Sequence, residues 1–93
     1  MANGDGRRSF VRCRVSRGFF RGEVLVMVAE SSAYVSLANV RIPEVPASGD
    51  AEGQVSAYVI ERSGDKTLIE LPGQPVVGGS RTWVPTESLS ASA

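Results

Sequence analysis

The amino-acid sequence predicts one small, mostly antiparallel all-β domain, a barrel of five or six strands. Short runs of alternating apolar and polar residues recur along the chain and are separated by Gly-, Pro- and Ser-containing turn signals. No segment longer than about eight residues has helical periodicity. The chain has 93 residues, which suits a single domain, and residues 9–89 are too few for a full sandwich, so a barrel is favoured. We expect residues 1–8 and 90–93 to be disordered tails.

The first predicted strand covers residues 10–15. Val11, Cys13 and Val15 alternate with Phe10, Arg12 and Arg14, which predicts a core face and a solvent face that carries the arginines. Residues 16–22 break the strand and form a loop that includes Phe19 and Phe20.

The second predicted strand covers residues 23–30 and is apolar on both faces. One face belongs to the core. The outward face is either Val24-Val26-Val28 or Leu25-Met27-Ala29, and another part of the protein or a partner must shield it from solvent. The loop of residues 43–53 is long enough to provide it, and a second subunit is the alternative.

The remaining elements follow in order along the chain. After a turn at residues 31–32, residues 34–37 form a strand with Val35 and Leu37 inward, and a bulge leads to residues 39–42. Residues 54–62 and 66–71 form a hairpin around Gly64. The last strand covers residues 81–84, Pro85 ends it, and residues 86–89 form at most one 3₁₀ turn.

The segment Thr82-Trp83-Val84-Pro85-Thr86-Glu87-Ser88-Leu89 resembles the closing segment of SH3 domains, in which an aromatic–aliphatic–Pro strand end precedes a 3₁₀ turn and a final hydrophobic residue. The resemblance implies an SH3-like barrel. It does not extend to proline-peptide recognition, because the tandem tryptophans of that groove and the usual opening of SH3 domains are absent.

The composition argues against an enzyme. The chain has no histidine, which excludes Ser-His-Asp and Cys-His nucleophile activation, and its single Cys13 sits on a core face. The glycines of residues 73–79 lack a phosphate-loop pattern, and the acidic loop of Glu44, Asp50 and Glu52 lacks calcium-loop spacing. We therefore expect no catalytic residues, no cofactor and no metal.

One enzymatic alternative uses this fold without histidine. Thr82-Trp83-Val84-Pro85 with Leu89 also resembles the last strand of the plasmid-borne type II dihydrofolate reductases, SH3-like barrels that assemble into a tetramer around one pore. A Gln-Ile-Tyr run is required before the proline in that family, and this chain has Thr82-Trp83-Val84 in its place.

Charge is distributed unevenly although the formal net charge is zero. Residues 1–22 carry six arginines against Asp5 alone, whereas the rest of the chain is acidic. Arginine with interleaved aromatics is how small barrels bind single-stranded nucleic acid. The candidate residues for that function are Phe10, Arg12, Arg14, Arg17, Phe19, Phe20 and Arg21. Alternatively, Phe19 and Phe20 fill the core, and the arginines pair with Glu23, Glu30 or Glu61 across the sheet.

The favoured prediction is a non-enzymatic interaction module that binds another protein, which includes the possibility of its own copy. Its candidate contacts are Tyr34, Tyr58 and Trp83. No apolar run approaches the length of a membrane span, no secretory signal follows the first residues, and the lone cysteine favours a reducing compartment, so we expect a cytoplasmic protein without membrane partners.

Overall fold

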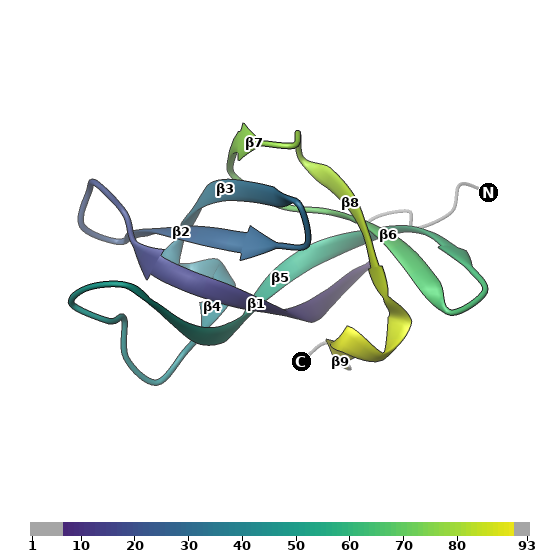
Figure 1. Cartoon of the computed structure of the whole chain (residues 1–93), viewed down its shortest axis with the longest axis horizontal. Coiled ribbons are helices and arrows are strands. Elements are labelled where there is room, and N and C mark those ends of the chain that lie inside the picture. Colours follow the sequence, from purple (N-terminus) through teal and green to yellow (C-terminus); the bar gives the residue numbers. More distant parts are fainter. Residues whose placement is uncertain (1–6, 91–93) are drawn as a thin grey trace.

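The computed structural model describes residues 7–90, which form one antiparallel sheet that curls into a half-barrel (Figure 1). Seven strands follow one path in the order β7-β3-β2-β1-β5-β6-β8, while β4 pairs with β5 and β9 pairs with β1. The strands are β1 (Arg8–Arg17), β2 (Glu23–Val28), β3 (Ser31–Ser36), β4 (Val40–Arg41), β5 (Asp50–Ser63), β6 (Lys66–Glu70), β7 (Gln74–Val77), β8 (Arg81–Pro85) and β9 (Leu89–Ser90).

The prediction of a small all-β, barrel-like domain is confirmed, but two details were wrong. Nine strands replace the expected five or six, because β4 and β9 are two-residue pairings and β7 is a short edge strand. Two 3₁₀ turns replace the single expected one. The expected turn is η2 (Thr86–Ser88), and the second is η1 (Leu37–Asn39), where the Ser36 hydroxyl accepts a hydrogen bond from the Ala38 amide at 3.2 Å.

β1 and β5 form the centre of the sheet. They pair along nine positions, from Arg8 opposite Tyr58 to Ser16 opposite Asp50. Val11, Cys13 and Val15 are buried on one face, as their alternation predicts, and Val55, Ala57 and Val59 of β5 are buried with them. The core therefore lies inside the curl of the sheet and consists mainly of valines.

The predicted strand of residues 23–30 is β2, which ends at Val28. Val24, Val26 and Val28 are buried, whereas Leu25 and Met27 are half-buried on the outer face. The turn to β3 lies at Ala29 and Glu30, not at Ser31-Ser32, and Ala29 adopts a φ of 52° there. Leu37 was predicted to point inward, but η1 turns it out to the surface.

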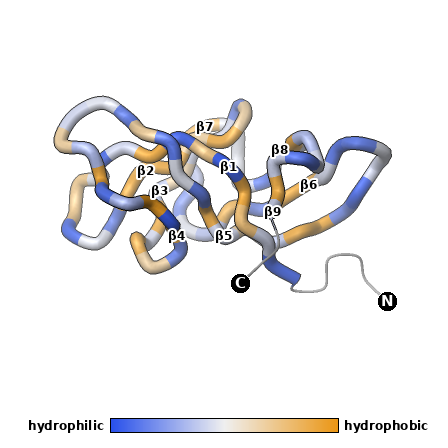
Figure 2. Tube along the Cα trace, turned by 90° about the horizontal axis from the view of Figure 1, so that it is seen from below, coloured by the Kyte–Doolittle hydropathy of each residue, from blue (hydrophilic) through white to orange (hydrophobic). Residues whose placement is uncertain are grey.

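The β5–β6 hairpin is confirmed, with Gly64 at a φ of 63° in its hydrophilic turn (Figure 2). Three residues that the sequence assigned to the two tails belong to the fold: Arg8 lies in β1, Ser90 lies in β9, and the backbone oxygen of Arg7 accepts a hydrogen bond from the Val59 amide at 2.9 Å. The other tail predictions concern residues 1–6 and 91–93, outside the described part of the chain.

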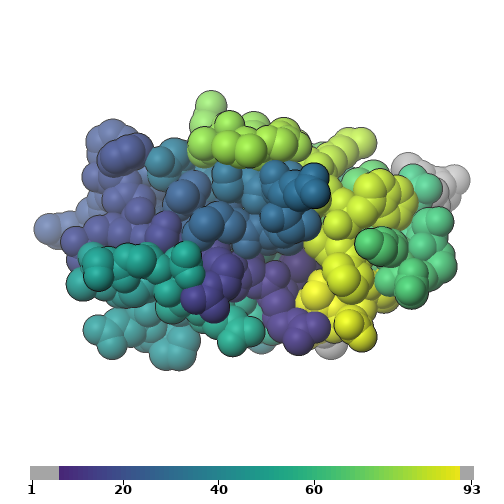
Figure 3. Space-filling model, in the orientation of Figure 1, coloured from purple at the N-terminus to yellow at the C-terminus, as the bar shows by residue number. Residues whose placement is uncertain are grey.

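The molecule is elongated, with extents of 41 × 22 × 20 Å (Figure 3). Ten residues of β1 span about 30 Å, so this strand extends along most of the long axis of the molecule (Figure 1). The β1–β2 hairpin forms one end, and the start of β1 lies towards the opposite end, where the β5–β6 hairpin is found.

Candidate functional site

The arginines of the solvent face of β1 have partners within the protein. The Nε of Arg14 donates to Asp50 at 2.8 Å, and the Arg12 guanidinium donates to the backbone oxygen of Glu87 at 3.3 Å. Phe10 lies under a third guanidinium, that of Arg41, 3.8 Å from its ring centroid. Three of the seven predicted nucleic-acid contacts are thus engaged in contacts within the fold.

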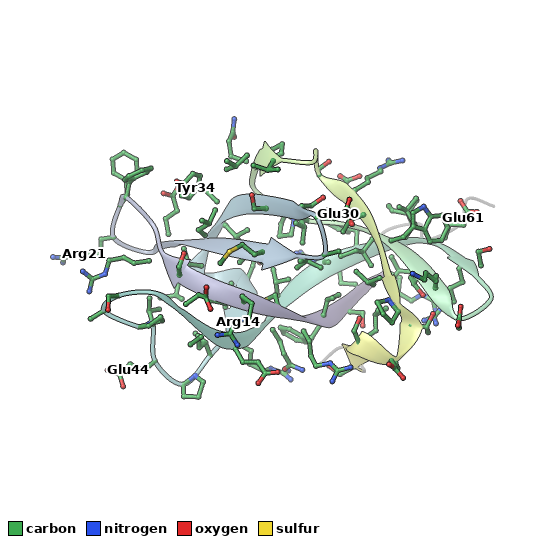
Figure 4. The ribbon with its side chains drawn as sticks, viewed as in Figure 1. Arg14, Arg21, Glu30, Tyr34, Glu44 and Glu61 are labelled. Carbon is green, nitrogen blue, oxygen red and sulfur yellow. The ribbon has the colours of Figure 1, made fainter. Side chains whose placement is uncertain are left out.

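The prediction that Glu23, Glu30 or Glu61 pairs with these arginines was wrong. The ion pairs within residues 7–90 are Arg14–Asp50 and Arg81–Glu70, and neither involves Glu23, Glu30 or Glu61. Glu61 lies at the opposite end of the molecule from Arg21 (Figure 4). Asp50, which the sequence assigned to the acidic loop, is the first residue of β5, and the long β1–β5 pairing places it beside Arg14.

The other four predicted nucleic-acid residues, Arg17, Phe19, Phe20 and Arg21, lie together at the end of the β1–β2 hairpin. Phe19 is 81% exposed and Phe20 is 73% exposed, so neither fills the core. The Phe19 ring packs against Tyr34 of β3 with a centroid distance of 5.5 Å, and Arg21 and Tyr34 share this end of the molecule (Figure 4). We call this surface the aromatic end; it consists of Arg17, Phe19, Phe20, Arg21, Tyr34 and Leu37.

A hollow of about 440 Å³ opens within the aromatic end. Phe19, Phe20, Leu37 and Val45 supply apolar walls, while Arg17, Arg21 and Glu23 supply charged groups. An apolar concavity with a few charged groups at its border is typical of a binding site on a small domain. The sequence pattern missed Leu37 and Val45, because Leu37 was expected to face the core and Val45 stands in a loop.

Backbone hydrogen bonds hold the aromatic end in place. The amide of Gly18 donates to the Glu23 oxygen at 3.2 Å, and the amide of Glu23 donates to the Phe20 oxygen at 3.2 Å. The amide of Leu37 donates to the Gly22 oxygen at 2.8 Å, which ties η1 to the hairpin. Gly18 permits this close approach, because a Cβ there would lie 2.5 Å from the Glu23 oxygen. The exposed rings therefore stand on an ordered backbone.

The three predicted protein contacts lie in different places. Tyr34 belongs to the aromatic end, whereas Tyr58 is half-buried near the start of β1, beneath the Arg8 guanidinium at 4.4 Å from the ring centroid. Trp83 is 41% exposed on the edge strand β8. It lines a hollow of about 570 Å³ between β8 and the β2–β3 turn, together with Glu30, Lys66 and Arg81. The structure does not combine these three residues into one surface.

The interior of β1 holds the single thiol. Cys13 is buried, and desolvation by burial raises its pKa from 9.0 to about 12. A thiol with this pKa is unreactive at neutral pH, because the thiolate is the nucleophilic form. Between residues 7 and 90, no three His, Cys, Asp or Glu side chains gather into a group able to hold a metal ion. In the same part of the chain, no helix has the length and hydropathy needed to cross a membrane.

Comparisons with protein-family models, with curated proteins and with solved structures find no match for this chain.

Proposed function

We propose that this chain is a non-enzymatic module that binds another protein through its aromatic end. The observation that carries the proposal is the exposure of two consecutive phenylalanines, Phe19 and Phe20, at a hairpin end whose backbone is held by hydrogen bonds. Aromatic residues and arginine are the residue types enriched in protein interfaces and in their energetic hot spots.

The ordered backbone supports binding in a further way. A partner that binds the aromatic end does not have to order the hairpin first, so less of the interaction energy is lost as conformational entropy. The hollow beside Phe19 and Phe20 can receive an apolar side chain of the partner, and Arg17 and Arg21 can contact its carboxylates or carbonyl groups.

A single-stranded nucleic acid is the second candidate for the same surface, because Arg17 and Arg21 flank the two exposed rings. Two observations favour a protein. First, the arginines on the solvent face of β1 are already engaged, since Arg12 and Arg14 have partners in the fold. Second, Glu23 also lines the hollow at the aromatic end, and its negative charge disfavours a phosphate backbone nearby.

The test compares two double variants of the full chain. Phe19→Ser with Phe20→Ser removes the rings of the aromatic end, and Val76→Ser with Val77→Ser removes two exposed valines of β7 as the matched control. Self-association is measured by sedimentation equilibrium over a range of concentrations, and retained proteins are quantified by mass spectrometry after affinity capture. We expect the phenylalanine variant to lose self-association or a defined set of retained proteins, and the valine variant to keep them.

Identical behaviour of the two variants and the wild type would contradict the proposal. A titration with a mixed single-stranded oligonucleotide at low and physiological salt separates the second candidate. Salt-sensitive ¹⁵N-HSQC shifts confined to residues 17–22 would favour nucleic acid over protein.

A further inference from the structure

A second hollow, of about 430 Å³, lies away from the aromatic end, near the start of β1. Its polar lining consists of three arginines and three hydroxyl residues from four segments of the chain: Arg7, Arg8, Arg62, Ser9, Thr86 and Ser90. Among residues 7–90, no carboxylate lines it. We call this surface the arginine end. Its residues lie up to 83 positions apart in the sequence, and the β1–β5 and β1–β9 pairings bring them together.

The three arginines have no ion-pair partner within residues 7–90. Both ion pairs of that part of the chain belong to other arginines, Arg14 and Arg81. Three positive charges around one hollow repel one another, and an anion bound among them removes that repulsion. The arginine end therefore has the electrostatics of an anion-binding site.

Arg8 is held in place and is partly withdrawn from water. Its Nη2 donates to the Ser56 oxygen at 3.2 Å, and its guanidinium carbon lies 4.4 Å from the Tyr58 ring centroid. Its Nε is buried and has no hydrogen-bond partner among residues 7–90. A cation in such a place gains more from a nearby anion than a fully hydrated cation does. The adjacent backbone is also fixed, since the Val59 amide donates to the Arg7 oxygen at 2.9 Å.

Among the hydroxyl groups that line the arginine end, Ser90 can donate a hydrogen bond to a bound anion. The Ser90 hydroxyl accepts a hydrogen bond from the Gln54 side-chain amide at 3.4 Å, which leaves its own proton free to donate. Ser9 is committed, because its hydroxyl donates to the Ser90 backbone oxygen at 2.6 Å. Thr86 shares a 2.8 Å hydrogen bond with the fully buried Thr67.

We propose that the arginine end binds a phosphate monoester or inorganic phosphate. A phosphoryl group brings up to two negative charges and three or more acceptor oxygens, which matches several guanidinium groups and a hydroxyl donor. A carboxylate brings one charge and two oxygens, and so leaves part of this donor set unused. The proposal is independent of the aromatic end, since the two surfaces share no residue.

The test is a ¹⁵N-HSQC titration of the full chain with inorganic phosphate at constant ionic strength, with sodium chloride as the balancing salt. Parallel titrations use glycerol phosphate, dimethyl phosphate and acetate, which separate a monoester from a diester and from a carboxylate. We expect saturable shifts at Arg8, Arg62, Thr86 and Ser90 with phosphate and glycerol phosphate, and much weaker ones with dimethyl phosphate and acetate.

Arg7 and Arg62 are exposed, so Arg7→Gln and Arg62→Gln should keep the fold, which the dispersion of each spectrum verifies. Each variant should bind phosphate about tenfold more weakly, as the loss of a charged hydrogen bond implies. The control Arg21→Gln, at the aromatic end, should bind as the wild type does. Shifts equal to those caused by chloride, equal affinity in the Arg7→Gln Arg62→Gln double variant, or equal weakening in Arg21→Gln would overturn the proposal.

Discussion

At the hairpin end of β1, two phenylalanines are largely exposed, whereas the hollow at its start is lined by arginines that have no carboxylate partner within residues 7–90. The same strand supplies residues to both surfaces, and between them Val11, Cys13 and Val15 contribute to the core. The difference comes from what the neighbouring segments add. η1 and the loop at Val45 add apolar walls at one end, and β5 and β9 add Arg62 and Ser90 at the other.

This comparison shows that one rigid strand can present two chemically distinct surfaces. In the core between them, Val11 and Val15 of β1 pack with residues such as Ile69 of β6. Four substitutions test how far the two ends depend on that shared core and how far each end is independent.

The largest effect is expected in the shared core. Ile69→Ala removes a fully buried side chain, and we expect a loss of about 2–5 kcal/mol in the free energy of unfolding. Val76→Ala, at a half-exposed valine, is the control and should change stability by less than about 0.5 kcal/mol. Urea denaturation measures both. A loss at Ile69 no larger than that at Val76 would mean that the two ends do not share a tightly packed core.

The next effect is local to one end. In Gly18→Ala the new Cβ would meet the Glu23 backbone oxygen at 2.5 Å, and no flexible side chain can yield there. We expect a loss of about 1–3 kcal/mol and shifted amide resonances around residues 17–23 and Leu37.

The matched variant at the β5–β6 turn is Gly64→Ala. Its Cβ would meet nothing within 4 Å, so only the φ of +63° opposes it, at about 1–2 kcal/mol. The amide resonances shifted by Gly64→Ala should be confined to residues near Arg62. Shifts from Gly18→Ala that reach Arg62 would show that the ends are coupled and not independent.

The sequence predicted the elements that depend on local pattern. The alternation of Val11, Cys13 and Val15 gave the buried face of β1, and Gly64 between two strand-forming runs gave the β5–β6 hairpin. It did not predict the start of β3 at Ser31, because this serine is buried through a long-range hydrogen bond to the Gly78 oxygen at 3.3 Å. The side chain of Ser36 is a capping signal for η1 that could have been recognised.

The two candidate surfaces were predictable to different extents. Phe19 and Phe20 are adjacent in the sequence to Arg17 and Arg21, so their proximity could be inferred directly. The arginine end could not be inferred, because Arg8 and Arg62 are brought to one hollow by the register in which Arg8 lies opposite Tyr58. The same register problem explains why Arg41 over Phe10 was not foreseen.

A third prediction concerns the thiol in the middle of β1. The pKa of Cys13 is raised by burial from 9.0 to about 12, so above pH 9 the unfolded chain releases a proton that the folded chain keeps. The release of this proton favours unfolding, so the free energy of unfolding should fall by about 1.4 kcal/mol per pH unit from pH 9 towards pH 12. Cys13→Ala should lack this part of the pH dependence. Equal slopes for the two proteins between pH 9 and 10.5, measured by urea denaturation, would contradict the burial of the thiol.

The smallest effect distinguishes Arg14, which is ion-paired, from the three arginines of the arginine end. Arg14 and Asp50 form an ion pair at the surface, with side chains 53% and 42% exposed, and solvent screens such pairs strongly. Asp50→Asn should therefore cost no more than about 1 kcal/mol. It should also leave phosphate binding at the arginine end unchanged, because a single released guanidinium does not reproduce three guanidiniums around one hollow. If Asp50→Asn created a second saturable phosphate site at Arg14, release from a carboxylate alone would explain anion binding, and the arrangement of Arg7, Arg8 and Arg62 would lose its significance.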